Sequence, residues 1–228
     1  MNPYFKFEFL FYAIPVAFAG IHFFEFSSYY ARVAGLRTSS ILLGYSYQQM
    51  CFVVTRFFYI GLMPLLGIVV DSNIRLDLYK ELVHLSLLSA GFFYAVAYFF
   101  RGGIVKFFER RLGAPVVFDT AYRKFSFCGF LNNKKIVFLS CVVFCVYSIG
   151  VFASFYYALQ FYEYRVTISQ LSGVINGFAT VLLTFIVEPA LARRIDTKDQ
   201  DSINTIYYIM IGRFIGVAIV SHFVFLFI

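Results

Sequence analysis

The chain has 228 residues, of which 61% are hydrophobic and only 14% are charged, and its formal net charge is +7. Soluble domains carry roughly 25% charged residues, so this composition excludes an ordinary water-soluble enzyme or binding domain. The apolar residues form continuous runs close to the roughly 20 residues that a helix needs to cross a bilayer. A membrane β-barrel would show shorter, alternating segments. We therefore predict an all-α integral membrane protein, a bundle of about six transmembrane helices.

The six expected spans follow one another along a single transmembrane domain that covers residues 1–228. We interpret the first as a spanning helix and not a signal peptide, because Glu8 and Pro15 interrupt the signal pattern and the apolar run continues past it. The spans cover Phe7–Phe26, Ser40–Met63, Leu82–Phe100, Ile136–Phe161, Val166–Val187 and Ile203–Ile228.

The second apolar stretch continues to Val70 and is too long for one simple span. Its last third contains two glycines and Pro64. Proline removes a helical hydrogen bond, and glycine loosens a helix. We therefore expect the second helix to be broken near Gly61–Gly67, with a short further piece ending at Asp71. This break is the expected hinge.

Lysine and arginine are divided unequally between the two sides. The loops after the first, third and fifth spans hold 13 of them, the opposite side holds four, and two lie within spans. Cytoplasmic loops are enriched in these residues, so we expect these three loops in the cytoplasm and both termini outside. The largest is a basic loop at residues 101–135. Within it, residues 104–112 resemble a basic amphipathic helix that could lie on anionic headgroups, or an ordinary positive-inside loop.

Two arginines lie within expected spans, where a charge facing lipid costs roughly 2.5–3.5 kcal/mol on insertion scales, so both should face the interior. Arg56 shares one helical face with Tyr45 and Gln49, and Arg213 lies in the sixth span. The fifth span carries a stripe of small and polar residues suited to close packing. Its members are Ser169, Gly173, Asn176, Gly177, Thr180 and Thr184, followed by Glu188.

The patterns Gly173-xxx-Gly177 and Gly212-xxx-Gly216 are both of the GxxxG type. Such patterns serve packing within a chain or between chains. Packing inside this chain, pore lining and a homodimer all remain open.

No common enzymatic motif and no closely spaced pair of carboxylates within one span is present, so we expect no catalytic residue, metal or cofactor. Buried arginine favours an anion, because guanidinium binds phosphate and carboxylate in a bidentate manner. Near the end of the first span, Glu25 and Arg32 lie two turns apart, as an interfacial salt bridge would. These residues indicate a membrane protein that handles a phosphate or carboxylate, with no nucleic-acid partner.

Residues 25–71 resemble a known family. The first of them resemble, in residue type and spacing, the motif that follows the first helix of the Amj lipid II flippases. The later ones resemble a second sequence motif of that family. The quoted residues are Glu25, Tyr29, Arg32, Gly35, Arg37-Thr38, then Thr55-Arg56, Pro64-Leu-Leu-Gly67 and Asp71; Glu188-Pro189 resembles a further acidic-proline position.

The resemblance implies a bacterial inner-membrane protein of cell-wall synthesis, an alternate to the MurJ flippase. Its partners would be membrane lipids and lipid II, the peptidoglycan precursor linked to undecaprenyl pyrophosphate, which it would move to the outer leaflet. The expected substrate-binding residues are Arg32, Arg37, Arg56, Arg213, Glu25, Tyr29, Gln49, Asp71, Asn176 and Glu188.

Two alternatives remain. A transporter of a smaller anion would use the same arginines around a sealed central site. An intramembrane enzyme acting on polyprenyl phosphate would need an acid–base pair, for which only His22 with Glu25 is available. A cavity open sideways between helices would favour the flippase.

Overall fold

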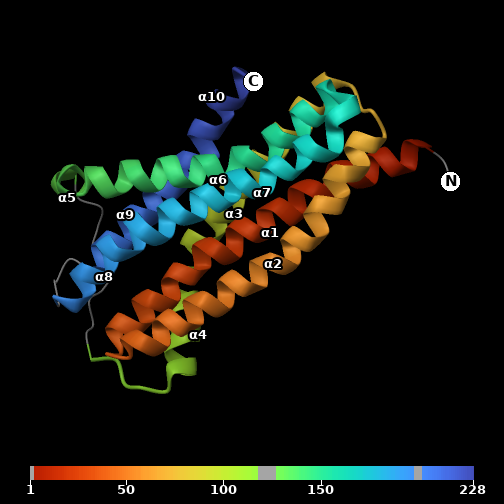
Figure 1. The fold of residues 1–228 in the computed structure, drawn as a ribbon. Helices are drawn as coiled ribbons and strands as arrows, with labels where there is room; N and C mark the ends of the chain where they lie inside the picture. The colour runs from red at the N-terminus through yellow and green to blue at the C-terminus, as the bar shows by residue number, and fades with distance from the viewer. Residues whose placement is uncertain (1–2, 118–126, 198–201) are drawn as a thin grey trace.

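The computed structural model describes residues 3–117, 127–197 and 202–228, which are helical nearly throughout (Figure 1). Six helical stretches are long and apolar enough to cross a membrane, as the all-α prediction required. They are α1 (Pro3–Arg37), α2 (Ile41–Asp71), α3 (Leu76–Phe99), α6 (Lys134–Gln160), α7 (Arg165–Leu182) continued by η2 (Leu183–Val187) and α8 (Glu188–Asp196), and α9 (Ser202–Ile215) continued by η3 (Gly216–Val220) and α10 (Ser221–Leu226). The short helices are α4 (Arg101–Leu112), α5 (Phe127–Asn132) and η1 (Tyr162–Tyr164).

The long helices alternate in direction, so both termini lie at one end of the bundle (Figure 1). We call this the termini end. The opposite end carries the last turns of α1, α4 and α8, each of which contains arginine, and we call it the basic end. This arrangement agrees with the predicted separation of charge. That the basic end faces the cytoplasm stays a prediction.

Helix α1 continues well beyond the predicted end at Phe26, to Arg37. Much of its last third is buried in protein, and α2, α4 and α9 all contact α1. The fully buried side chains there are Tyr29, Tyr30, Ala31 and Ala34. Glu25 and Arg32 therefore lie inside the bundle.

Helix α2 is continuous from Ile41 to Asp71, so the predicted break near Gly61–Gly67 is wrong. Pro64 lies within the helix and removes a single N–H donor. On both sides of it, Leu62 and Leu66 are fully buried in the core. Neighbouring helices support a proline-containing membrane helix in this way. The departures from α-helix geometry lie instead in the π-helical segments η2 and η3.

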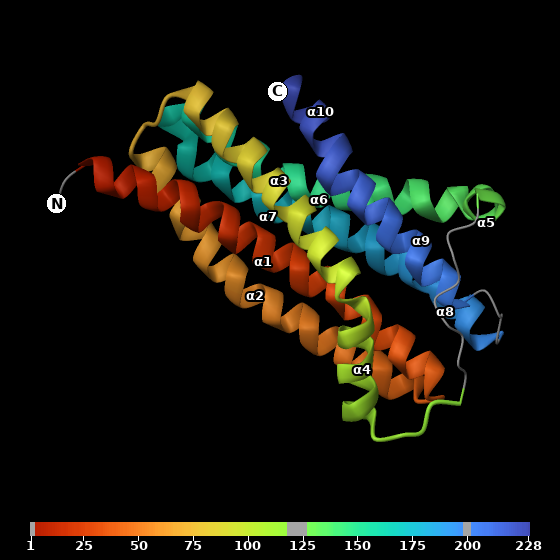
Figure 2. The same ribbon diagram turned by 180° about the vertical axis from the view of Figure 1, so that it is seen from behind.

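The helices form two groups (Figures 1 and 2). Helices α1 and α2 lie side by side in one group, and α6 and α7 lie side by side in the other. Helices α3 and α9 cover the face seen in Figure 2 and join the groups, since α3 contacts α6 and η3, and α9 contacts α1 and α6. The largest fully buried side chains include Arg213, Tyr79, Tyr94 and Phe152.

The expected short helix in the basic loop is present as α4. Its apolar residues Val105, Phe108 and Leu112 are buried, and the helix packs on α1. Lys106, Arg110 and Arg111 are exposed. Contact with anionic headgroups stays a prediction, and residues 118–126 of this loop lie outside the described residues.

The two GxxxG patterns lie in different surroundings. A Cβ on Gly212 or Gly216 would come within 2.4 Å of a carbonyl oxygen of α6, so these glycines permit close packing inside the chain. A Cβ on Gly173 or Gly177 would meet nothing within 4 Å. A homodimer formed through this open face of α7 stays a prediction.

Candidate functional site

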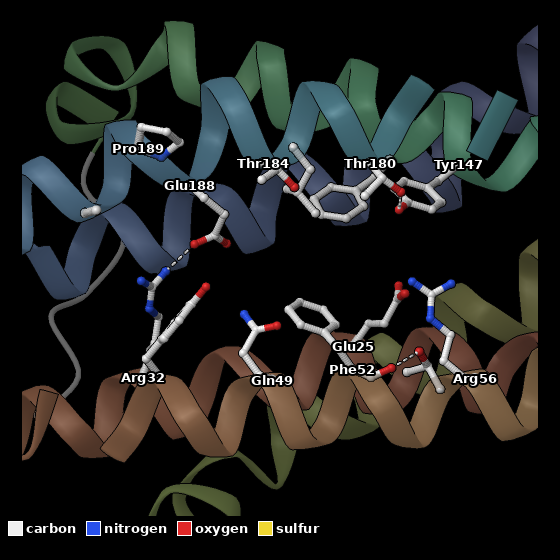
Figure 3. Close-up of a pocket in the computed structure, with 15 residues that line it drawn as sticks. Glu25, Arg32, Gln49, Phe52, Arg56, Tyr147, Thr180, Thr184, Glu188 and Pro189 are labelled. Carbon is white, nitrogen blue, oxygen red and sulfur yellow. Dashed lines mark hydrogen bonds and ion pairs between the residues drawn. The ribbon is translucent and has the colours of Figure 1, made fainter. Parts of the chain in front are cut away.

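A cleft of about 640 Å³ lies between the two helix groups (Figure 3). Helices α1 and α2 form one wall, and α6, α7, η2 and α8 form the other. The lining residues are Glu25, Arg32, Tyr45, Gln49, Phe52, Thr55, Arg56, Phe144, Tyr147, Thr180, Leu183, Thr184, Glu188, Pro189 and Ala192.

The polar face predicted for the second span forms the α2 wall. Tyr45, Gln49 and Arg56 all line the cleft, as their spacing indicated. Gln49 and Arg56 are also exposed, as is Thr184 on the opposite wall. A sealed chamber would bury such residues, so the site is an open cleft.

The opposite wall follows the predicted stripe of the fifth span. Thr180, Thr184 and Glu188 line it one turn apart, and Tyr147 of α6 hydrogen-bonds to the Thr180 hydroxyl. The stripe passes through η2, whose wider π-helical turns are frequent at functional sites. Glu188 begins α8, and Pro189 follows it.

One ion pair crosses the cleft. Nη1 of Arg32 in α1 lies 2.6 Å from Oε2 of Glu188 (Figure 3). The two side chains are only 10% and 19% exposed, and the Arg32 guanidinium also lies 4.8 Å from the centre of the Tyr45 ring. The predicted Glu25–Arg32 pair is therefore not formed, because Arg32 pairs with Glu188 of α8 and Glu25 pairs with Arg213 of α9.

Glu25 pairs instead with Arg213 of α9, which is completely buried. The Arg213 Nε donates to the Tyr94 hydroxyl at 2.9 Å, and this hydroxyl lies 2.6 Å from Nδ1 of His22. The Tyr94 hydroxyl therefore links Arg213 to His22, and the direction of its hydrogen bond with Nδ1 depends on the imidazole tautomer. The Arg213 guanidinium also lies 4.0 Å from the centre of the Phe144 ring.

The contacts in this network offset the free-energy cost of burying the charged Arg213 side chain. The ion pair, the hydrogen bond and the aromatic contact join α1, α3, α6 and α9 in the core. Arg213 does not line the cleft, whereas its contacts Glu25 and Phe144 do. The structure therefore places Arg213 as a residue that holds the helices together.

Arg56 has the opposite setting. Within the described part of the chain it forms no ion pair and no hydrogen bond, although it lines the cleft. The other cleft charges are balanced, Arg32 by Glu188 and Glu25 by Arg213. Arg56 thus leaves the cleft with one unneutralised positive charge.

Besides Arg213, four further predicted site residues lie away from the cleft. Arg37 pairs with Glu109 of α4 at 3.1 Å, and Asp71 pairs with Arg165 at 3.3 Å at the termini end. Tyr29 is fully buried in α1, and Asn176 turns towards α6.

Sequence reasoning missed two tyrosines, Tyr94 and Tyr147. Each lies within an apolar helix, where a buried phenolic hydroxyl needs a hydrogen-bond partner. This requirement could have marked both tyrosines as members of polar networks. Across residues 3–117, 127–197 and 202–228, no group of three or more His, Cys, Asp or Glu side chains could hold a metal ion.

Apolar side chains flank the polar walls. Val53 and Phe57 of α2 are 61% and 69% exposed, and Phe185 of η2 is 75% exposed. The same helices therefore present polar groups to the cleft and apolar groups beside it. This arrangement suits a ligand that has both a polar and an apolar part.

The fold and the cleft define a multi-pass helical membrane protein with a cationic cleft between two helix groups. Comparison with protein families matches residues 125–227 to the family described as Amj, Alternate to MurJ. This match makes the C-terminal part of the chain similar to the Amj family. Glu188-Pro189 lies within the matched residues, whereas the resemblance at residues 25–71 lies outside them. No curated protein and no solved structure matches the chain.

Proposed function

We propose that the protein is a lipid II flippase, which moves the undecaprenyl-pyrophosphate-linked peptidoglycan precursor across the bacterial inner membrane. The observation that carries this proposal is Arg56, a cation without a partner in the described chain on the wall of an open cleft. An arginine in this position supplies donors for a phosphate. The family description, Alternate to MurJ, supports the same role.

The two parts of lipid II have different surroundings in this proposal. Gln49, Thr180 and Thr184 offer hydrogen bonds to the sugar–peptide headgroup inside the cleft. The polyprenyl chain stays in lipid beside the exposed apolar residues of α2 and η2. A headgroup can cross in this way while its tail never leaves the hydrocarbon.

Movement across the membrane requires two states, each open to one side. Two ion pairs join the helix groups at opposite ends of the molecule, Arg32–Glu188 towards the basic end and Asp71–Arg165 at the termini end. We propose that these contacts open in turn. With the basic end in the cytoplasm, the exposed cations of α4 would gather anionic substrate.

The alternatives have less support. A transporter of small anions requires no open side, whereas Gln49, Arg56 and Thr184 are exposed. For an enzyme, His22 would need to face a substrate, but its side chain is buried and does not line the cleft.

A rescue experiment tests the proposal. The protein is expressed in bacterial cells whose own lipid II flippases can be depleted, and growth and cell shape are measured after depletion. We expect rescue. Failure of a well-expressed wild-type protein in the membrane fraction would contradict the proposed function.

A further inference from the structure

We propose that the Arg32–Glu188 pair is a second binding subsite of the cleft, which takes a zwitterionic part of the substrate headgroup. A carboxylate of the ligand would bind Arg32, and an ammonium group of the same ligand would bind Glu188. This inference rests on the proposed function and deepens it, because it names the feature of the headgroup that the cleft selects.

The two charged ends of the cleft are far apart. Arg56 lies at one end of it in Figure 3, and Arg32 and Glu188 lie at the other. Arg32 lies against Tyr45, eleven residues before Arg56 on α2, and this spacing corresponds to about 16 Å along a helix axis. One pyrophosphate is too small to bind both arginines, so the Arg32–Glu188 pair faces a different part of a ligand held at Arg56.

The headgroup of a peptide-bearing lipid is long enough to reach the pair. About five residues of extended peptide, at roughly 3.3–3.6 Å each, cover the distance between the two ends. Gln49 lines the cleft between them, and Thr184 lines the opposite wall (Figure 3). A ligand whose pyrophosphate binds Arg56 can therefore place the end of its peptide at Arg32 and Glu188.

The pair offers one binding group for each sign of charge. Its hydrogen bond joins one guanidinium nitrogen, Nη1 of Arg32, to one carboxylate oxygen, Oε2 of Glu188, at 2.6 Å. A guanidinium has five N–H donors and binds a carboxylate through two parallel hydrogen bonds. A carboxylate of the ligand can thus bind Arg32 in a bidentate manner, while Glu188 accepts hydrogen bonds from an ammonium group.

Charge balance distinguishes a zwitterion from a simple anion at this subsite. The two side chains are only 10% and 19% exposed, so losing a counter-ion costs them more than it costs groups in water. An anion on Arg32 would replace one ion pair by another and leave Glu188 without a cation. A zwitterion gives each residue a counter-charge and replaces one ion pair by two. The pair therefore favours a ligand group that carries both charges.

The backbone around Glu188 permits the pair to separate. Its N–H bonds to the carbonyl of Leu183, five residues back, and Pro189, the next residue, has no N–H to donate. Regular α-helical hydrogen bonds therefore do not fix this turn. Because the pair also joins the two helix groups towards the basic end, binding of the zwitterion and opening of this contact are one event.

Binding measurements on the purified full-length chain in nanodiscs test this subsite. Two probes are compared, both short-chain polyprenyl pyrophosphates that carry a disaccharide and a peptide with one lysine. In the second probe the lysine side chain is acetylated, which removes the ammonium group and keeps every carboxylate. We expect the wild type to bind the first probe about ten-fold more tightly, since a hydrogen bond between charged groups contributes enough free energy for this ratio.

Two variants locate the source of this preference. Glu188→Gln should bind both probes equally, because it removes the partner of the ammonium group. Glu109→Gln is the matched control. It breaks the Arg37–Glu109 pair, which is similarly shielded, at 13% and 11% exposure, but lies outside the cleft. The control should keep the ten-fold preference, and the unfolding midpoints of both variants are measured alongside.

The outcomes separate this inference from the proposed function. Equal binding of both probes to the wild type overturns the zwitterion subsite and leaves the anion site at Arg56 intact, and this result needs no variant. An undiminished preference in Glu188→Gln overturns the subsite as well. Absence of binding of either probe to the wild type would overturn the proposed function, together with this inference.

Discussion

The α9–α6 interface and the cleft between α2 and α7 contain the same kinds of residue in opposite settings. Each has an arginine within a membrane span and a GxxxG pattern close by. At the α9–α6 interface, Arg213 is completely buried and paired, and Gly212 lies against α6. In the cleft, Arg56 is exposed, and in α7 a Cβ added to Gly173 would meet nothing within 4 Å. Residue type alone therefore does not distinguish a structural arginine from a binding arginine. The ion-pair and hydrogen-bond partners of each arginine do.

Replacing Arg213 should have the largest effect on stability. Arg213→Ala leaves Glu25 without its counter-ion and removes the contacts with Tyr94 and Phe144. Breaking a buried pair costs about 3–5 kcal/mol. The thermal unfolding midpoint in detergent should fall sharply, whereas Arg75→Ala, at an exposed position, should leave it unchanged. Wild-type stability of Arg213→Ala would remove the distinction between the two regions.

Tyr94→Phe should have the next largest effect. It deletes the hydroxyl that accepts from Arg213 and meets His22, and so leaves two buried polar groups unsatisfied. Loss of a hydrogen bond to a charged group costs about 1.5–3 kcal/mol. The same unfolding assay measures it. An unchanged midpoint would show that the hydroxyl contributes nothing to the core.

The two glycine patterns should respond differently to alanine. In Gly212→Ala the new Cβ would lie 2.4 Å from the Val137 carbonyl oxygen, so α9 must move away from α6. Overpacking of this kind costs about 1–3 kcal/mol. Gly173→Ala has open space and should leave stability unchanged or slightly higher, since alanine favours helix. Equal losses for both variants would show that Gly173 is also packed, as in a dimer.

Much of this architecture could be predicted from the sequence, because the bilayer imposes length and hydrophobicity on each span. The shared face of Gln49 and Arg56 followed from helical periodicity alone. The C-terminal end of α1 could not be predicted from hydrophobicity, because its polar residues are buried by other helices. Pro64 led to the wrong prediction of a broken second helix. The packing of Leu62 and Leu66 against other helices outweighs the one hydrogen bond that the proline removes.

The partners of the charged residues also lay beyond sequence reasoning. Glu25 and Arg32 are seven positions apart and share a face, which favours a local pair. Their actual partners, Arg213 of α9 and Glu188 of α8, come from helices distant in the sequence. Pairing across a bundle depends on how distant helices pack, and one sequence does not contain that information.

Replacing Arg56 should have the smallest effect on stability, so a loss of function in such a variant would report on its proposed role as the anion ligand of the cleft. In flippase-depleted cells, Arg56→Ala is compared with the wild type and with Arg75→Ala, and membrane levels and unfolding midpoints are measured for all three. The predicted result is loss of rescue by Arg56→Ala at a normal protein level and midpoint, with full rescue by Arg75→Ala. Full rescue by Arg56→Ala would contradict the account.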